Sequence, residues 1–74
     1  MANYSVVANA DMKSVTVVDE KGLQKGKIYL TNGTICGMPM VTGDRIAIPF
    51  ADAGYRYMVY YSLPQLTYIT QIPL

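Results

Sequence analysis

The residues of this sequence best suited to recognition are its tyrosines. The chain has 7 tyrosines, 1 phenylalanine and no tryptophan. A tyrosine ring joins a large apolar body to a polar tip, so it can stack on a nucleic-acid base or fill a protein contact that excludes water. A plainer alternative is that these rings are half-buried strand residues that cap a thin core. The candidate protein interface consists of six tyrosines and one arginine: Tyr29, Tyr55, Arg56, Tyr57, Tyr60, Tyr61 and Tyr68.

Residues for catalysis are scarce. The sequence contains no histidine, so a Ser-His or Cys-His nucleophile pair cannot form within the chain. The 5 acidic residues fall in expected turns and bends, where short polar side chains serve the turn itself. We therefore assign no catalytic residue and expect a protein that is not an enzyme. The acidic residues interpreted as turn residues are Asp11, Asp19, Glu20, Asp44 and Asp52.

Metal and cofactor sites are not expected either. Cys36 is the single cysteine, so the chain has neither an intramolecular disulfide nor the clustered Cys and His ligands of a structural zinc site. Beside Ile35 and Gly37 in an expected strand, Cys36 is interpreted as a small buried apolar residue. Most glycines fall in expected turns, and none belongs to a phosphate-binding loop. We expect no metal and no cofactor.

The charge of the chain is low. Asp, Glu, Lys and Arg make up 15% of its residues, where about 25% is typical. The formal net charge is +1, far from the basic excess of a protein that holds nucleic acid through phosphates. Nucleic acid is therefore not the favoured partner.

Apolar residues alternate with polar ones far more often than they recur at helical spacing, which predicts an all-β fold with little or no helix. Residues 1–74 form one domain, because the chain has only 74 residues. We expect a small barrel or sandwich of about six or seven short antiparallel strands, of the SH3-like, OB-like or jelly-roll-fragment kind. The expected strands are residues 4–8, 12–19, 23–31, 34–41, 45–50, 55–63 and 66–72.

Turn signals separate these strands. Residues 19–22 fit a tight hairpin that ends on a glycine. The strongest signal is Asn32-Gly33, which predicts a type I′ hairpin that sets Leu30 across from Ile35. Pro39 has no amide hydrogen, so an interruption is expected there. Further turns are expected at residues 42–44, 51–54 and 63–65.

The strand 55–63 is the most strand-like run and is apolar on both sides. Such a strand is either buried on both faces or buried on one face and covered by another molecule on the second. The sequence leaves open which face is core. With a period of two, one side carries Tyr55, Tyr57, Val59, Tyr61 and Leu63, and the other carries Arg56, Met58, Tyr60 and Ser62.

A small chain without disulfide or metal usually gains support from association. We therefore expect a structural or assembly subunit, in its most specific form a small virion (phage) accessory protein that decorates or cements a capsid or tail through a tyrosine-rich β face. Its expected partners are further copies of the chain or capsid and tail proteins. This expectation relies on analogy at the level of the fold. The alternative is a small β-barrel that binds single-stranded nucleic acid or acts as a regulatory factor.

The ends of the sequence bear on location. Residues 1–4 lack the basic region and long apolar core of a signal peptide, which predicts synthesis in the cytoplasm, with the virion as a further site. Residues 57–74 carry no charge. Pro64, Pro73 and several polar residues make this stretch a poor membrane helix, so we expect no membrane span.

Overall fold

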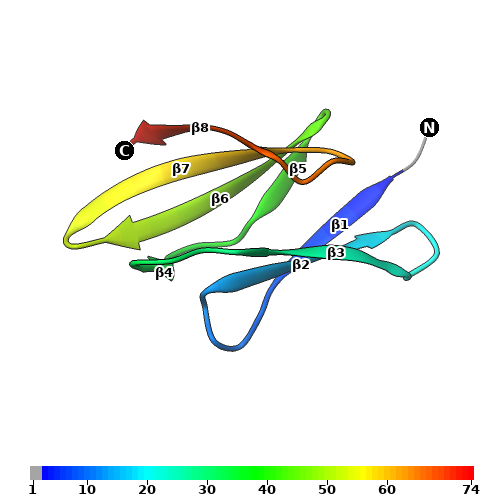
Figure 1. Ribbon diagram of the computed structural model, residues 1–74, viewed down its shortest axis with the longest axis horizontal. Helices are drawn as coiled ribbons and strands as arrows, with labels where there is room; N and C mark the ends of the chain where they lie inside the picture. Colours follow the sequence, from blue (N-terminus) through cyan, green and yellow to red (C-terminus); the bar gives the residue numbers. More distant parts are fainter. Residues whose placement is uncertain (1–2) are drawn as a thin grey trace.

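Two antiparallel β-sheets face each other across one hydrophobic core in the computed structural model of the chain, which describes residues 3–74 (Figure 1). The molecule measures 37 × 23 × 17 Å. No helix occurs within residues 3–74, so the all-β prediction is confirmed. The strands are β1 (Tyr4–Ala8), β2 (Ser14–Asp19), β3 (Gln24–Tyr29), β4 (Thr34–Ile35), β5 (Met40–Thr42), β6 (Arg45–Asp52), β7 (Tyr55–Ser62) and β8 (Tyr68–Pro73).

The smaller sheet has the order β1-β2-β3 and is built from two successive hairpins. Val15 and Val17 of the central strand β2 are fully buried, whereas Thr16 between them is only half-buried. This alternation is the expected one, because successive side chains of a strand point to opposite faces. The smaller sheet therefore contributes one row of valines to the core.

The larger sheet has the order β4-β6-β7-β8, and β5 also pairs with β6. The long strand β6 is paired with β4 near its C-terminal end and with β5 near its N-terminal end. Pro39 lies in the gap between β4 and β5, so the predicted interruption is confirmed. The break divides the expected strand 34–41 in two, which is why the described residues contain eight strands rather than six or seven.

The core lies between the sheets and follows the alternation that the sequence predicts. Ile46 and Ile48 of β6 are fully buried, and Phe50 is 6% exposed, as expected of a core anchor. The two sheets do not close into a barrel by hydrogen bonds, so the architecture is an open sandwich. The buried core residues are Val15, Val17, Ile28, Ile35, Ile46, Ile48, Phe50, Val59 and Leu63.

The predicted Asn32-Gly33 hairpin is wrong. Strand β3 pairs with β2, and β4 pairs with β6, so the segment between them crosses from one sheet to the other. Gly33 lies where an added Cβ would be 2.8 Å from two atoms of the Phe50 ring. The two-residue turn with positive φ at both positions occurs instead at Ala53 and Gly54, with φ of 51° and 84°. Close packing of the connection on β6 outweighs the local turn preference.

The prediction of a buried Cys36 is also wrong, because its side chain is exposed. Ile35 takes the core position opposite Phe50. The pairing continues to Cys36, whose backbone N–H donates to the Pro49 carbonyl oxygen at 2.9 Å. Neighbouring residues of an extended chain point to opposite sides. Cys36 therefore faces away from the core.

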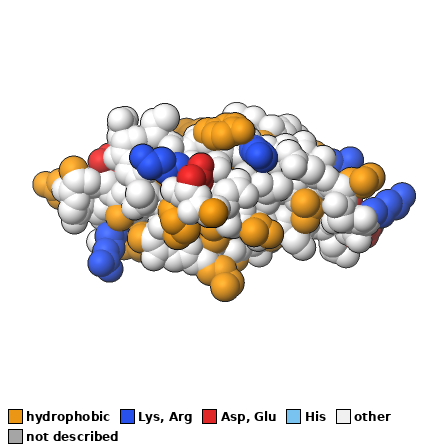
Figure 2. Space-filling model, turned by 90° about the horizontal axis from the view of Figure 1, so that it is seen from below, with side chains coloured by type: hydrophobic (Ala, Val, Ile, Leu, Met, Phe, Trp, Pro, Cys, Tyr) orange, Lys and Arg blue, Asp and Glu red, His pale blue; other side chains and the backbone are white. Residues whose placement is uncertain are grey.

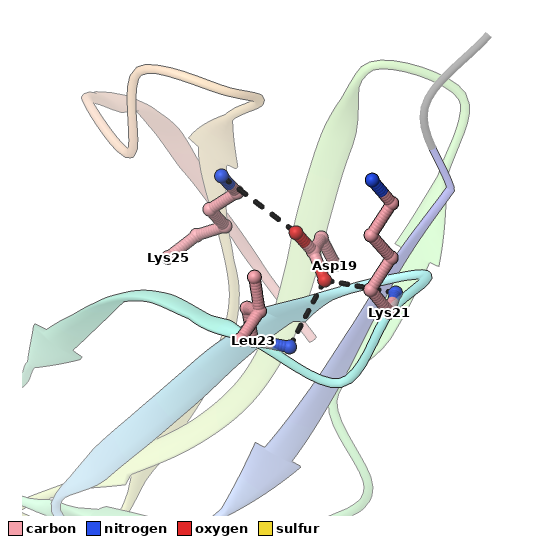
Figure 3. A network of polar contacts seen from close by, with 4 residues as sticks. All are labelled: Asp19, Lys21, Leu23 and Lys25. Atoms are coloured by element: carbon pink, nitrogen blue, oxygen red, sulfur yellow. Dashed lines mark hydrogen bonds and ion pairs between the residues drawn. The ribbon is translucent and has the colours of Figure 1, made fainter.

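The β2–β3 turn is organised by Asp19 (Figure 3). Its Oδ1 accepts hydrogen bonds from the backbone N–H groups of Lys21 at 2.9 Å and Leu23 at 3.0 Å, and Lys25 Nζ lies 3.6 Å from Oδ2. The Leu23 N–H is the main reason that the pKa of Asp19 lies below its ordinary value. Asp11 accepts the Lys13 N–H at 2.9 Å in the same way. Both carboxylates act as the turn residues that the sequence predicts.

We expect the substitution Asp19→Asn to remove part of the acid sensitivity of the fold. The ordinary pKa of Asp19 is 3.8, and folding lowers it, so the unfolded chain binds the proton more readily. The stability that this charge contributes is therefore present above pH 4 or so and is lost as the pH falls through the folded pKa. Thermal melts from pH 7 to pH 2 should show a lower Tm for the variant at pH 7 and convergence with wild type in acid.

The matched control is Glu20→Gln in the same turn, because Glu20 makes none of the side-chain hydrogen bonds found within residues 3–74. This control should follow the wild-type melting curve at every pH. A difference in Tm between Asp19→Asn and wild type that stays constant down to pH 2 would contradict the stabilising role assigned to the Asp19 carboxylate.

Candidate functional site

The side chains of strand β7 lie on two different surfaces. Val59 is 4% exposed in the core, and Tyr57 and Tyr61 pack against that core while remaining half-buried. The side of β7 with odd residue numbers is therefore the inner side. Arg56, Met58, Tyr60 and Ser62 lie on the outer side, which answers the question that the sequence leaves open.

The first surface is a cleft lined by residues of both sheets, which we call the tyrosine cleft. It has a volume of about 280 Å³ and lies between the chain that leaves β3 and the inner side of β7 and β8. Four tyrosines from both sheets line it: Tyr29, Tyr57, Tyr61 and Tyr68. The fold thus gathers four of the seven candidate interface residues around one cavity.

Tyr61 and Tyr68 meet as an aromatic pair. Their ring centroids are 5.9 Å apart, and the ring planes stand at 82°, the edge-to-face arrangement that aromatic quadrupoles favour. Burial, and secondarily the nearby Tyr68 hydroxyl, raise the pKa of Tyr61 above its ordinary value of 10.0. The two rings form neutral walls that stand nearly at right angles.

Polar groups complete the lining. Asn32, Asp52 and Gln71 line the tyrosine cleft beside the four rings, and none of the described lining residues is Lys or Arg. Asp52 is half-buried. Within residues 3–74 the two ion pairs are Lys25–Asp19 and Arg45–Asp44, so the Asp52 carboxylate is not engaged in one. The cleft therefore carries one formal negative charge.

The second surface is the side of the larger sheet turned away from the core, which we call the outer sheet face. On this side Met58 lies between Pro49 and Ile72, and Tyr60 lies between Ala47 and Thr70. Met40 extends the row next to Ala47. Met40 is 57% exposed and Ile72 is 50% exposed, so apolar surface reaches solvent here.

Two arginines mark the ends of the outer sheet face. Arg45 lies opposite Ser62 and Arg56 lies opposite Ala51, so they stand at opposite ends of the β6–β7 pair. They are the charged residues among the described outward positions of β4 to β8. By contrast, the molecule seen from the side of β2 and β3 carries acidic and basic side chains among the hydrophobic ones (Figure 2). The centre of the outer sheet face is thus uncharged.

An apolar groove lies between β1 and the segment before β5. It has a volume of about 410 Å³ and is lined by residues 6–8 and 37–39. Val7 and Met38 are exposed at its rim. The groove adds to the uncovered apolar surface of the chain.

The structure distributes the candidate interface residues of the sequence over separate places. The tyrosine cleft gathers four of them, and Arg56 and Tyr60 belong to the outer sheet face. Tyr55 is exposed at the start of β7. Sequence reasoning missed Asp52 as a lining residue of the cleft because it was assigned to a turn. Its place in the alternation after Ile48 and Phe50 is the signal that could have found it.

Residues 3–74 contain no group of three His, Cys, Asp or Glu side chains placed to hold a metal ion. Within the same described part of the chain, no helix has the length and apolar character needed to cross a membrane. Neither a protein-family model, a curated protein nor a solved structure matches the chain.

Proposed function

We propose that this protein is a non-enzymatic structural subunit that joins a larger protein assembly through its outer sheet face. The observation that carries the proposal is the pattern of this face, in which Met58, Tyr60 and Ile72 form an apolar centre and Arg45 and Arg56 lie at the ends. Protein interfaces have this composition, with charge depleted at the centre and Met, Tyr and Arg enriched.

The small size of the fold supports the proposal. The chain has 74 residues and a single cysteine, so no internal disulfide reinforces it. Strand β8 forms an edge of the larger sheet and carries no charge from Tyr68 to Pro73. Natural proteins usually protect a free edge with charges or cover it. A partner that packs on this sheet would cover both the face and the neighbouring edge.

The two arginines indicate the chemistry of the partner. Two copies could pack through the same face with aligned strands, related by a twofold axis that runs either along the strands or across them. Because Arg45 and Arg56 lie at opposite ends of the face, both arrangements would bring an arginine of one copy against an arginine of the other. This like-charge contact disfavours that dimer. The partner surface is therefore an apolar patch with acidic or uncharged ends, on a different protein or on a different part of another copy. In its most specific form, the proposal is a virion accessory protein that decorates or cements a capsid or tail.

The test compares two tyrosines of β7. Tyr60→Ser should weaken association about tenfold or more, because a buried interface tyrosine is a typical hot spot, and should leave the strand signal of the circular dichroism spectrum unchanged. Tyr57→Ser should instead lower the Tm, because Tyr57 packs against the core. Association is measured as the fraction of chain that remains in the native assembly on a density gradient.

The matched control is Tyr29→Ser, an exposed tyrosine of the other sheet, which should remain assembled. If Tyr60→Ser stays in the assembly as well as wild type does, the outer sheet face is not the contact. If the purified chain shifts labelled single-stranded DNA or RNA with a steep salt dependence, the assembly proposal loses its main support.

A further inference from the structure

We propose that two copies of the chain pair antiparallel through the open edge of strand β1, with the twofold axis at Val7. Strand β1 is an edge of the smaller sheet, and within residues 3–74 it is hydrogen-bonded to β2 alone. The pairing would join the smaller sheets of the two copies into one continuous sheet. It does not depend on the proposed assembly contact, because the outer sheet face belongs to the larger sheet.

The backbone of β1 directs unpaired hydrogen-bonding groups to its open edge. The Asn9 N–H donates to the Ser14 carbonyl oxygen at 3.0 Å, and the register of β1 with β2 continues from this pair. Hydrogen-bonded and non-hydrogen-bonded pairs alternate in an antiparallel ladder. Val7 therefore bonds to β2, whereas Val6 and Ala8 direct their N–H and C=O groups away from it. No other backbone hydrogen bond of Val6 or Ala8 occurs in the described part of the chain.

Strand β1 also lacks the features that usually keep an edge strand from pairing with another molecule, namely charge, proline and bulges. It carries no charge from Tyr4 to Ala8, and its register with β2 is regular. The opposite edge strand, β3, carries Lys25 and Lys27. In the larger sheet, β8 ends on Pro73 and shifts its register with β7, and β4 and β5 have only two and three residues. Strand β1 is therefore the edge most open to a further strand.

The side chains beside this edge indicate an uncharged, apolar strand as the occupant. The apolar groove of about 410 Å³ is lined by Val6, Val7 and Ala8 and, across from them, by residues 37–39. Val7 is 56% exposed and Met38 is 83% exposed. An added strand would cover this apolar surface, and a charged one would lose hydration without gaining an ionic partner. Strand β1 of a second copy has the required composition.

Pairing around Val7 satisfies the free groups of both copies. Val6 of each copy then lies opposite Ala8 of the other, and each of these pairs can exchange both backbone hydrogen bonds. The two Val7 side chains meet at the centre as a non-hydrogen-bonded pair, where side chains are closest and β-branched residues pack well. No like charges meet, in contrast to a dimer through the outer sheet face. The edge of β1 is thus complementary to itself.

The experiment follows the purified full chain at increasing concentration by sedimentation velocity and by NMR amide exchange. We expect a weak dimer with a Kd of about 100 µM, because one strand pair buries less surface than a standard interface. As the dimer forms, the amide protons of Val6 and Ala8 should exchange at least about fivefold more slowly. A chain that stays monomeric up to about 1 mM, or a dimer in which these two amides exchange as they do in the monomer, would overturn the proposal.

Two lysine substitutions locate the contact. Val7→Lys sets two ammonium groups against each other at the twofold axis and should weaken the dimer about tenfold, with the NMR spectrum confirming that the fold is kept. Ile72→Lys introduces the same charge at a position that is 50% exposed on the outer sheet face, and it should dimerise as wild type does. A dimer that Ile72→Lys abolishes and a folded Val7→Lys variant retains would overturn the β1 pairing and assign self-association to the larger sheet.

Discussion

Ile48→Ala will remove about 2–5 kcal/mol from the free energy of unfolding, because it deletes buried methyl groups and leaves a cavity. Ile48 is 0% exposed and lies at the centre of β6. On its inner side it packs in the cluster that includes Val15 and Val59, from both sheets. Ile48 is fully buried and paired with Val59 in mid-strand, so the backbone has little room to relax into the cavity, which places the expected loss toward the upper part of that range.

This loss is large for a chain of this length. Globular proteins are stable by roughly 0.05–0.15 kcal/mol per residue, which gives about 4–11 kcal/mol for 74 residues. A loss in the upper part of the range for Ile48→Ala would therefore remove about a third or more of the stability of the isolated chain. Urea unfolding followed by circular dichroism measures the change, with the midpoint shifting to lower urea at a similar slope.

Ile72→Ala is the matched control, because it makes the same chemical change at a position that is 50% exposed on the edge strand β8. It should cost less than about 1 kcal/mol, since little apolar area is lost from the interior. Equal costs for the two variants would show that the core does not lie between the two sheets.

Gly33→Ala is expected to cost about 3 kcal/mol. The new Cβ would be 2.8 Å from the Phe50 ring and would press on the Ala51 carbonyl oxygen. Phe50 is itself buried and Ala51 is paired in β6, so neither neighbour can move freely, and overpacked sites of this kind are strongly destabilising. The same urea measurement gives the cost.

The Gly33 substitution separates the two arrangements of this segment. If Asn32-Gly33 were the solvent-exposed type I′ turn that the sequence predicts, alanine would cost only about 1 kcal/mol for its positive φ. Gly22→Ala provides that reference, because Gly22 has a φ of 82° and open space around it. A Gly33→Ala cost no greater than that of Gly22→Ala would contradict the crossing of residue 33 onto β6.

The strands and most turns of this fold can be predicted from local patterns. Alternation alone places Ile46, Ile48 and Phe50 on one side of β6 and Val15 and Val17 on one side of β2. These patterns suffice because the core is two layers of side chains, each supplied by one face of a sheet. The break at Pro39 is also local, since proline lacks the donor that a paired strand needs.

The errors arise where packing between distant segments competes with local preference. Asn32-Gly33 has the composition of a hairpin turn. Gly33 instead packs closely against the Phe50 ring, and the chain crosses to the other sheet. Cys36 is exposed because Ile35 occupies the core position next to it. In both cases the deciding contact is with Pro49 or Phe50 of β6, more than ten residues further along the chain.

The candidate site could be predicted only in part. The tyrosine content indicates a recognition surface, but the sequence does not bring Tyr29 together with Tyr68, because that requires the packing of one sheet on the other. It also cannot choose between the two faces of β7, since Tyr57 and Tyr60 have the same residue type. The structure separates them by placing Tyr57 against the core and Tyr60 opposite Ala47 on the outer sheet face.

The most direct test of the proposed assembly role is the mass of the native particle that contains the wild-type chain, measured by light scattering on material purified without denaturant. The free chain has a mass of 8.2 kDa. Association through the outer sheet face predicts that the chain is recovered in a particle of several times this mass, which Tyr60→Ser releases as free folded chain. Recovery of the wild-type chain only as a folded 8.2 kDa monomer would contradict the proposed function.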